Sequence, residues 1–157
     1  MNNTQIRQGK PDDIPELLEL IKELAIFEKA ENEVIMTEKQ LMEDGFGANK
    51  QFDFIVAESD NSIQGIALYF YKFSTWKGKV IHLEDLIVKQ NLRQNGIGTL
   101  LFEAILEIAK KEKAYRMEWQ VLDWNEPAIK FYDKYKTEYG NEWLNARLNY
   151  EQLQSSN

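Results

Sequence analysis

The sequence predicts a single α/β domain in which helices flank a mixed, twisted sheet of about six to seven strands. Three observations predict it: apolar residues at helical spacing, runs rich in β-branched and aromatic residues, and a strand–helix–strand succession in the second half. The chain has 157 residues, which suits one domain with its own core, and no repeat or linker divides it. We expect one domain over 1–157, with any disorder confined to the tail from about residue 151.

Two helices are expected in the first half of the chain. One is marked by apolar residues at helical spacing over 14–25, and the other opens at the capping pair Thr37 and Gln40. Strands are expected where β-branched and aromatic residues concentrate, at residues 4–8, 52–58, 63–73 and 79–88.

The second half predicts a crossover between parallel strands. Apolar residues at helical spacing from Ile97 onward indicate a helix, and an apolar strand follows over about 115–122. Pro127 near the start of the next segment indicates another helix, and Tyr139–Tyr150 is expected to form a weaker final strand.

Composition excludes several kinds of chemistry. The chain has no cysteine and one histidine, His82, so a cysteine nucleophile, a thiolate metal site and a histidine metal cluster are excluded, and we expect no metal. The net charge of −7 argues against non-specific binding to nucleic acid. It suits a small cationic substrate, although a charge that only keeps the protein soluble is an equally ordinary explanation.

No basic, apolar leader begins the sequence, and no apolar run approaches the roughly 18 residues of a membrane-spanning helix. The expectation is therefore a cytoplasmic protein without a membrane partner.

A glycine-containing turn, Arg93–Gly98, lies where a predicted strand ends and a predicted helix begins. Glycines let backbone N–H groups approach an anion closely, and a helix N-terminus adds partial positive charge, so a pyrophosphate fits there. Glycines also end strands for structural reasons alone, so the spacing leaves both explanations open. The absence of a following Gly-Lys-Ser/Thr argues against a P-loop.

Arg93–Gly98 resembles the pyrophosphate-binding motif of the GNAT acetyltransferase superfamily, and the order of elements over nearly the whole chain agrees. Other segments are similar to the spermidine/spermine (diamine) acetyltransferase branch, namely Ile21–Ala25, Glu43–Gly47, Leu83–Asp85, Trp124–Pro127 and Phe131–Tyr132. Ser74–Gly78 and Val121–Asn125 are closest to the thialysine acetyltransferases of that branch. The resemblance implies a single GNAT-type domain that transfers an acetyl group from acetyl-CoA to an amine.

The resemblance also implies which residues bind acetyl-CoA. The backbone of one strand would hold the pantetheine arm, the glycine turn would hold the pyrophosphate, and the start of a later helix would contact the cofactor from the other side. These residues are Leu86, Ile87, Val88, Arg93, Gln94, Asn95, Gly96, Ile97, Gly98, Thr99, Asn125, Glu126, Pro127 and Ala128.

Two side chains are expected to move protons. An alkyl ammonium has a pKa near ~10.4 and must lose a proton before it attacks a thioester, and Glu84 is the candidate acceptor, directly or through water. Strand alternation would put His82 and Glu84 on one face and Asp85 on the other. The resemblance assigns Tyr132 as the acid that protonates the leaving thiolate. Each has an ordinary alternative: a solvated strand end for Glu84, a buried aromatic for Tyr132 and a structural hydrogen bond for His82.

The acceptor is expected to be a small cationic amine, such as thialysine, a lysine-like amine, a diamine or a polyamine. By the resemblance its contacts are Phe27, Glu28, Glu84, Glu118, Trp119 and Gln120. An acidic helix end exposed to solvent is the ordinary alternative for Glu28. Without cysteine, direct attack in a ternary complex is favoured over an acyl-enzyme. The resemblance further implies a homodimer.

One departure from the family pattern is Lys136, which stands where relatives usually have glycine and leaves the geometry after Tyr132 open. Two alternative functions also remain. One is an acetyltransferase for another acceptor, such as a protein lysine or an aminoglycoside, and the other is a non-catalytic module that binds acyl-CoA or polyamine.

Overall fold

A computed structural model of the chain describes residues 3–155. The chain forms two compact units, residues 1–120 and residues 121–157. The larger unit contains the whole sheet, and the smaller one contains helices and an extended stretch without regular structure.

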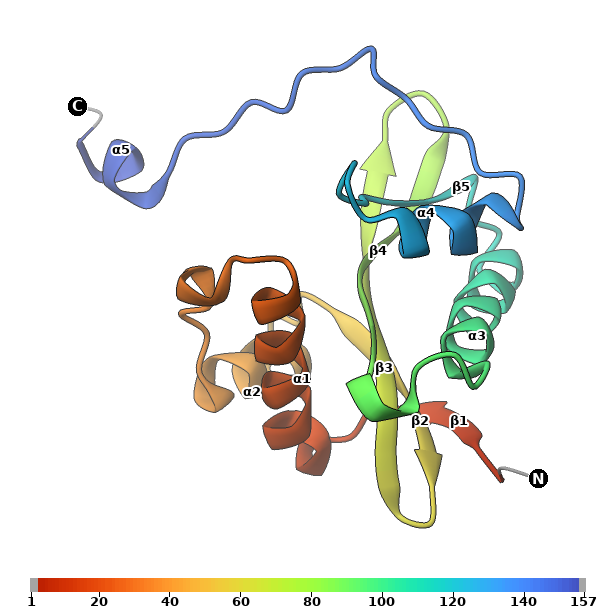
Figure 1. The fold of residues 1–157 in the computed structure, drawn as a ribbon. Helices are drawn as coiled ribbons and strands as arrows, with labels where there is room; N and C mark the ends of the chain where they lie inside the picture. The colour runs from red at the N-terminus through yellow and green to blue at the C-terminus, as the bar shows by residue number, and fades with distance from the viewer. Residues whose placement is uncertain (1–2, 156–157) are drawn as a thin grey trace. The chain divides into compact units, whose positions relative to one another are not determined.

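The sheet of the larger unit has the strand order β1-β2-β3-β4-β5 (Figure 1). Neighbours β1 to β4 pair antiparallel, whereas β5 pairs parallel to β4, as the predicted crossover requires. The strands are β1 Gln5–Gln8, β2 Asp53–Ser59, β3 Ser62–Ser74, β4 Gly78–Val88 and β5 Arg116–Trp119.

Helices cover both faces of this sheet (Figure 1). On one face, α1 and α2 pack on a buried cluster that includes Leu17, Leu41, Phe54, Leu68 and Ile87. On the other face, α3 contacts β3 and β4. The helices and short 3₁₀ turns of this unit are η1 Pro11–Asp13, α1 Ile14–Phe27, η2 Glu31–Glu33, α2 Glu38–Phe46, η3 Gln90–Leu92 and α3 Ile97–Lys111.

The ends of the helices follow the sequence signals. The Thr37 hydroxyl accepts a hydrogen bond from the Gln40 backbone N–H at 3.2 Å, which caps α2 as predicted. Lys110 and Lys111 occupy the last turn of α3, where positive charge complements the helix dipole.

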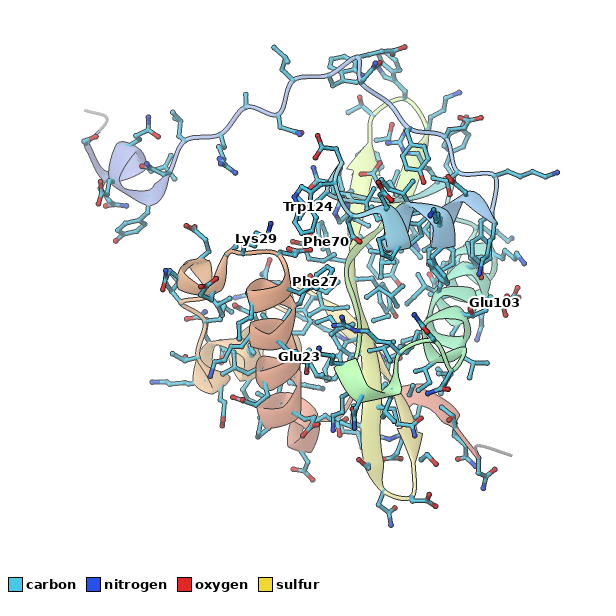
Figure 2. The ribbon with its side chains drawn as sticks, in the orientation of Figure 1. Glu23, Phe27, Lys29, Phe70, Glu103 and Trp124 are labelled. Atoms are coloured by element: carbon cyan, nitrogen blue, oxygen red, sulfur yellow. The ribbon has the colours of Figure 1, made fainter. Side chains whose placement is uncertain are left out.

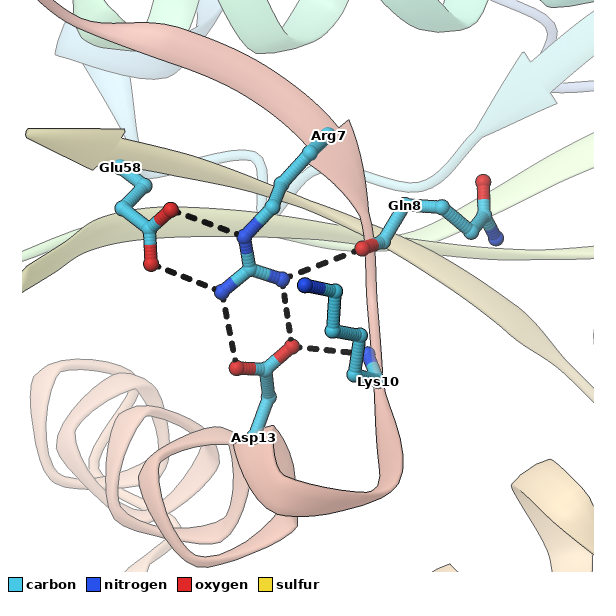
Figure 3. A network of polar contacts seen from close by, with 5 residues as sticks. All are labelled: Arg7, Gln8, Lys10, Asp13 and Glu58. Atoms are coloured by element: carbon cyan, nitrogen blue, oxygen red, sulfur yellow. Dashed lines mark hydrogen bonds and ion pairs between the residues drawn. The ribbon is translucent and has the colours of Figure 1, made fainter. Parts of the chain in front are cut away.

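An ion network ties the first strand to α1 and to β2 (Figure 3). The Arg7 guanidinium on β1 donates to both carboxylate oxygens of Asp13, at 2.7 and 3.0 Å, and to both of Glu58, at 2.9 and 3.0 Å. Asp13 also accepts from the Lys10 backbone N–H at 2.7 Å. Bidentate contacts of this kind fix direction as well as distance, so Arg7 sets how the chain leaves β1 and enters α1.

The smaller unit contains α4 Glu126–Asp133 and α5 Tyr150–Ser155. The Asn125 side chain caps α4 by accepting from the Ala128 N–H at 3.3 Å, and Pro127 lies in the first turn, as the sequence predicted.

The prediction of a final strand over Tyr139–Tyr150 is wrong, and the sheet has five strands instead of six or seven. Among the described residues, 3–155, the smaller unit contains no strand, so this stretch has no pairing partner within its own unit. Trp143 and Leu144 are accordingly 85% and 96% exposed. A strand needs a pairing partner, which an alternating sequence cannot supply by itself.

Candidate functional site

An irregularity in β4 shapes the candidate site. Leu68 of β3 pairs with Asp85 of β4, and the next residue of β3, Tyr69, pairs with Leu83 of β4. Glu84, between these two β4 residues, has no partner on β3 and forms a β-bulge. The extra residue reverses the alternation beyond it. Leu68 and Phe70 are two residues apart on β3, so their side chains lie on the same face, which is the face that α1 covers. Their β4 partners, Asp85 and His82, therefore share that face. The prediction that Asp85 lies on the opposite face from His82 is wrong for this reason.

The neighbouring strand β5 ends at the same point. Its parallel pairing with β4 runs from Val80 with Arg116 to Leu83 with Trp119 and stops there. The β4 segment that contains Leu86, Ile87 and Val88 continues without β5 beside it. Along this segment β5 takes none of the β4 backbone groups, although the Val88 carbonyl oxygen accepts from Arg93; a strand edge that its neighbour leaves is the arrangement expected for residues that hold a pantetheine arm.

His82 links two of the predicted site residues. Its Nε2 lies 3.3 Å from Glu84 Oε2, and its Nδ1 lies 3.3 Å from Glu118 Oε1. The ring packs against Phe70, tilted by 31°, with 4.8 Å between ring centroids. Glu118 is also bound by Lys72 and by the Arg116 Nε, which donates at 2.8 Å.

Three carboxylates gather where the end of α1 meets β4. Burial, together with the negative charges of Glu84 and Glu28, raises the pKa of Asp85 to about 7. Burial also raises the pKa of Glu28. The Glu84 side chain is 53% exposed, so the cluster opens to solvent. Such a group of acids favours a cation, because a positive charge beside Asp85 would restore its ionised form.

Arg93 connects the glycine turn to α1. Its Nε donates to the Val88 carbonyl oxygen at 3.1 Å, and its guanidinium carbon lies 5.3 Å from the centroid of the Phe27 ring. It also forms an ion pair with Glu23 at 3.7 Å (Figure 2). Glu23 in turn accepts from the Gln90 backbone N–H at 2.9 Å. A predicted cofactor residue and a predicted acceptor residue, Arg93 and Phe27, are therefore in contact.

The N-terminus of α3 has the features of an anion site. Gln94 and Gly96 have positive φ values of 65° and 81°, and no side chain caps the helix. At Gly98, an added Cβ would find only Val88 Cγ2, at 3.8 Å. Internal packing therefore does not explain a glycine inside a helix, where it costs about 1 kcal/mol relative to alanine. The open space at Gly98, the left-handed turn and the helix N-terminus together have the chemistry that a pyrophosphate site needs.

In the smaller unit, Tyr132 lies on α4 and is 8% exposed. The Thr137 hydroxyl donates to the Tyr132 carbonyl oxygen at 2.7 Å. Lys136, which replaces the usual glycine, has a φ of 56°. The backbone of Lys136 therefore has the left-handed conformation that glycine favours.

The structure does not bring every predicted acceptor residue together. The Trp119 ring packs edge-on against Phe102 of α3 at 5.2 Å, on the opposite face of β5 from Glu118. Gln120 follows the end of β5 and is exposed. Glu118 of β5 contacts His82.

Sequence reasoning missed the environment of Asp85 and the link from His82 to Glu118. A signal for the first exists: Glu84 and Asp85 are adjacent polar residues in an otherwise apolar strand, and this pair interrupts the alternation of Ile81 and Leu83. Such an interruption is typical of a bulge. No signal in the sequence indicated which residue of β5 would pair with His82.

Two further properties concern residues 3–155. No helix there is long and apolar enough to span a bilayer. No group of three or more histidine, cysteine or acidic residues in that range has the arrangement of a metal site.

The raised pKa of Asp85 makes a prediction about stability. Between the ordinary value of 3.8 and about 7, the folded protein holds a proton on Asp85 that the unfolded chain has released. The free energy of unfolding therefore falls as pH rises through this window. Asp85→Asn should remove that penalty, on the order of 4 kcal/mol at pH 8 and less at pH 5.

Urea unfolding of the variant and the wild type at pH 5 and pH 8 would measure this difference. The exposed Asp12→Asn provides the matched control, for which no widening between the two pH values is expected. An Asp85→Asn effect of the same size at both pH values would contradict the assigned environment.

Comparisons with known proteins agree with this geometry. The chain matches the Acetyltransferase (GNAT) family over residues 15–136. It is 35% identical over 140 residues to the mouse (Mus musculus) thialysine N-epsilon-acetyltransferase, covering 84% of this chain and 82% of the relative. It is 34% identical over 139 residues to the human (Homo sapiens) spermidine/spermine N(1)-acetyltransferase-like protein 1, covering 84% of this chain and 20% of that protein.

Solved structures show the same fold. An integron cassette protein from V. cholerae superposes with a TM-score of 0.78 at 22% identity, covering 96% of this chain and 95% of that one. An aminoglycoside acetyltransferase from an uncultured soil metagenomic sample, in complex with sisomicin, superposes with a TM-score of 0.75 at 18% identity, covering 93% and 95%. Because the family match spans most of the larger unit and α4, the chain belongs to the GNAT acetyltransferase family.

Proposed function

We propose that this acetyltransferase transfers the acetyl group of acetyl-CoA to the primary amine of a small cationic acceptor, of the thialysine, lysine-like or polyamine kind. The observation that carries the proposal is the group of three carboxylates, Glu28, Glu84 and Asp85, where α1 meets the bulge of β4. The names of the relatives, thialysine and spermidine/spermine acetyltransferases, support the same class of acceptor.

The acceptor binds through its positive charges. An ammonium beside Asp85 gains a charge partner and lowers the cost of ionising that buried carboxyl. Glu28 and Phe27 at the end of α1 offer a carboxylate and an aromatic ring to a second cationic centre. Glu118 adds a carboxylate from β5, although Lys72 and Arg116 already neutralise much of its charge. Trp119 and Gln120 complete the proposed acceptor set, although the Trp119 ring packs edge-on against Phe102.

Acetyl-CoA supplies the activated acetyl thioester, and the chain holds it through backbone groups. In the larger unit, Leu86, Ile87 and Val88 lie on the β4 edge that β5 leaves free. The loop and first turn of α3, from Arg93 to Thr99, present amide hydrogens and the positive end of the helix dipole to the pyrophosphate. Asn125, Glu126, Pro127 and Ala128, at the start of α4, complete the proposed set.

Two side chains move protons in the proposed reaction. The Glu84 carboxylate takes a proton from the acceptor ammonium, directly or through water, and frees the nitrogen lone pair. The nitrogen then attacks the thioester carbon, so that a C–N bond forms and the C–S bond breaks in one ternary complex. The Tyr132 hydroxyl protonates the leaving thiolate, and the second proton, lost by the acylated nitrogen, returns through water to the Tyr132 phenolate, so that the reaction releases one proton net.

The proposed role of Tyr132 predicts a specific kinetic defect. Tyr132→Phe should lower kcat by one to several powers of ten, because the thiolate loses its acid, while the Kd for acetyl-CoA stays unchanged. A screen of thialysine, lysine, spermidine and short diamines with a free-thiol readout measures turnover, and calorimetry measures cofactor binding. Tyr139→Phe is a matched control, because it removes a tyrosine hydroxyl that bonds to Asp133 of α4, the helix that contains Tyr132.

Equal turnover of wild type and Tyr132→Phe would reject the assigned acid. Acetylation of a peptide lysine or an aminoglycoside, with all of these small amines inert, would reject the acceptor class. Tight binding of acetyl-CoA with no turnover on any amine would favour a non-catalytic binding module.

The glycine turn before α3 leads to a prediction in which a substitution weakens acetyl-CoA binding without lowering the stability of the fold. Gly98→Ala should weaken acetyl-CoA binding at least about tenfold, because the new methyl group occupies space that we assign to the pyrophosphate. The melting temperature should stay the same or rise, since alanine is the better helix former. Leu100→Ala, in the same turn of α3, is a control that should leave the affinity unchanged. Unchanged affinity in Gly98→Ala would contradict this binding site.

We also propose that the protein is a homodimer. Apolar and polar residues alternate along Leu144–Tyr150, and the large apolar side chains there are exposed in the isolated chain. A second copy would bury them. Light scattering should give twice the chain mass for the wild type and the single-chain mass for a Leu144→Asp, Leu148→Asp variant. A wild type of single-chain mass would refute the dimer.

A further inference from the structure

His82 lies between two carboxylates that come from different strands. Its Nε2 is 3.3 Å from Glu84 Oε2 on the same strand, and its Nδ1 is 3.3 Å from Glu118 Oε1 on β5. Phe70 of β3 stacks on the ring, and the side chain is only 12% exposed. The imidazole therefore has a fixed orientation with one nitrogen toward each carboxylate.

The two nitrogens of a neutral imidazole cannot serve both carboxylates in the same way. One carries a hydrogen and donates, and the other presents a lone pair. One carboxylate thus receives a hydrogen bond, while the other faces a lone pair at 3.3 Å.

The surroundings of Glu118 decide which nitrogen donates. Burial alone would raise the pKa of Glu118, but hydrogen bonds from Lys72 and His82 and the charge of Arg116 bring it below its usual value. Glu118 is therefore a firmly ionised acceptor, and the hydrogen belongs on Nδ1. The lone pair of Nε2 then points at Glu84.

We propose that His82 is a positioning residue behind Glu84 and that its Nε2 takes over the proton that Glu84 removes from the acceptor. This inference rests on the proposed function. The ammonium N–H bond breaks as an O–H bond forms on Glu84, and that bond breaks in turn as Nε2–H forms. The resulting imidazolium lies between two carboxylates, and the one proton that amine acetylation releases returns to water through the half-exposed Glu84.

The contact between Glu84 and Nε2 of His82 favours proton transfer to this pair. With the ring neutral, the carboxylate oxygen of Glu84 faces the lone pair of Nε2 at 3.3 Å. An incoming proton converts that contact into a hydrogen bond. The charged groups that face the ring come from three strands: Glu84 on β4, Glu118 and Arg116 on β5, and Lys72 on β3 through its pair with Glu118.

The first experiment does not depend on turnover. His82 is the single histidine of the chain, so its ring nitrogens give unambiguous ¹⁵N NMR signals. In the neutral ring we expect the hydrogen on Nδ1, the less common tautomer of free histidine, and Glu118→Gln should shift the population toward Nε2–H. A wild-type ring with its hydrogen on Nε2 would overturn the proposal, because that nitrogen could not accept a proton.

The second experiment measures proton transfer. His82→Gln keeps a hydrogen-bonding side chain that cannot take up a proton, so kcat should fall about 10- to 100-fold while the KM for acetyl-CoA changes less than about twofold. In His82→Ala, added imidazoles should restore turnover more strongly as their basicity rises. Pyrazole, which has a similar shape but is a weaker base, should not rescue, and neither should imidazole added to Glu84→Gln.

The outcomes separate this inference from the proposed function. A wild type that acetylates no amine removes the proposed function, and the NMR tautomer then decides the inference about His82 alone. A His82→Gln variant with wild-type kcat, in an active enzyme, overturns the inference and leaves the proposed function intact. Rescue by pyrazole as strong as by imidazole would show that His82 only fills space.

Discussion

The arrangement of the larger unit depends on the extra residue in β4. By pairing with nothing on β3, Glu84 changes which side chains of β4 face α1, and it does so where β5 stops pairing. The result is one strand whose first half pairs with both β3 and β5 and whose second half pairs with β3 but not with β5. Acids then meet the end of α1 on one face, and the uncapped start of α3 follows Val88 after a short turn. A regular strand at this place would have turned Asp85 toward α3.

Most of the fold follows from local patterns in the sequence. Apolar spacing identified α1 and α3, the Thr37 cap identified α2, and β-branched runs identified the strands up to β4. The strand predicted over Tyr139–Tyr150 does not form. Its alternating sequence is typical of a strand, but a strand also needs a neighbouring segment with free backbone groups. The strand propensity of a segment can be predicted from that segment alone, whereas its pairing depends also on a second segment.

The candidate site was predictable where one motif determines it and less so where strands meet. The glycines before α3 and the adjacent Glu84 and Asp85 are visible in the sequence. The contact between His82 and Glu118 depends on the register of a parallel pair set by the length of the α3 crossover, which no local pattern encodes. Trp119 shows the same limit, since its face depends on that register and not on its neighbours in sequence.

The attachment of Arg93 to α1 has a thermodynamic consequence. Through the Phe27 ring and Glu23, the turn before α3 and the end of α1 share one side chain, although they are assigned to different ligands. A displacement of α1 by a bound acceptor would therefore move Arg93 and, with it, the turn that is assigned to acetyl-CoA. Linkage makes such cooperativity mutual, so whatever factor the first ligand imposes on the affinity of the second, the second imposes on the first.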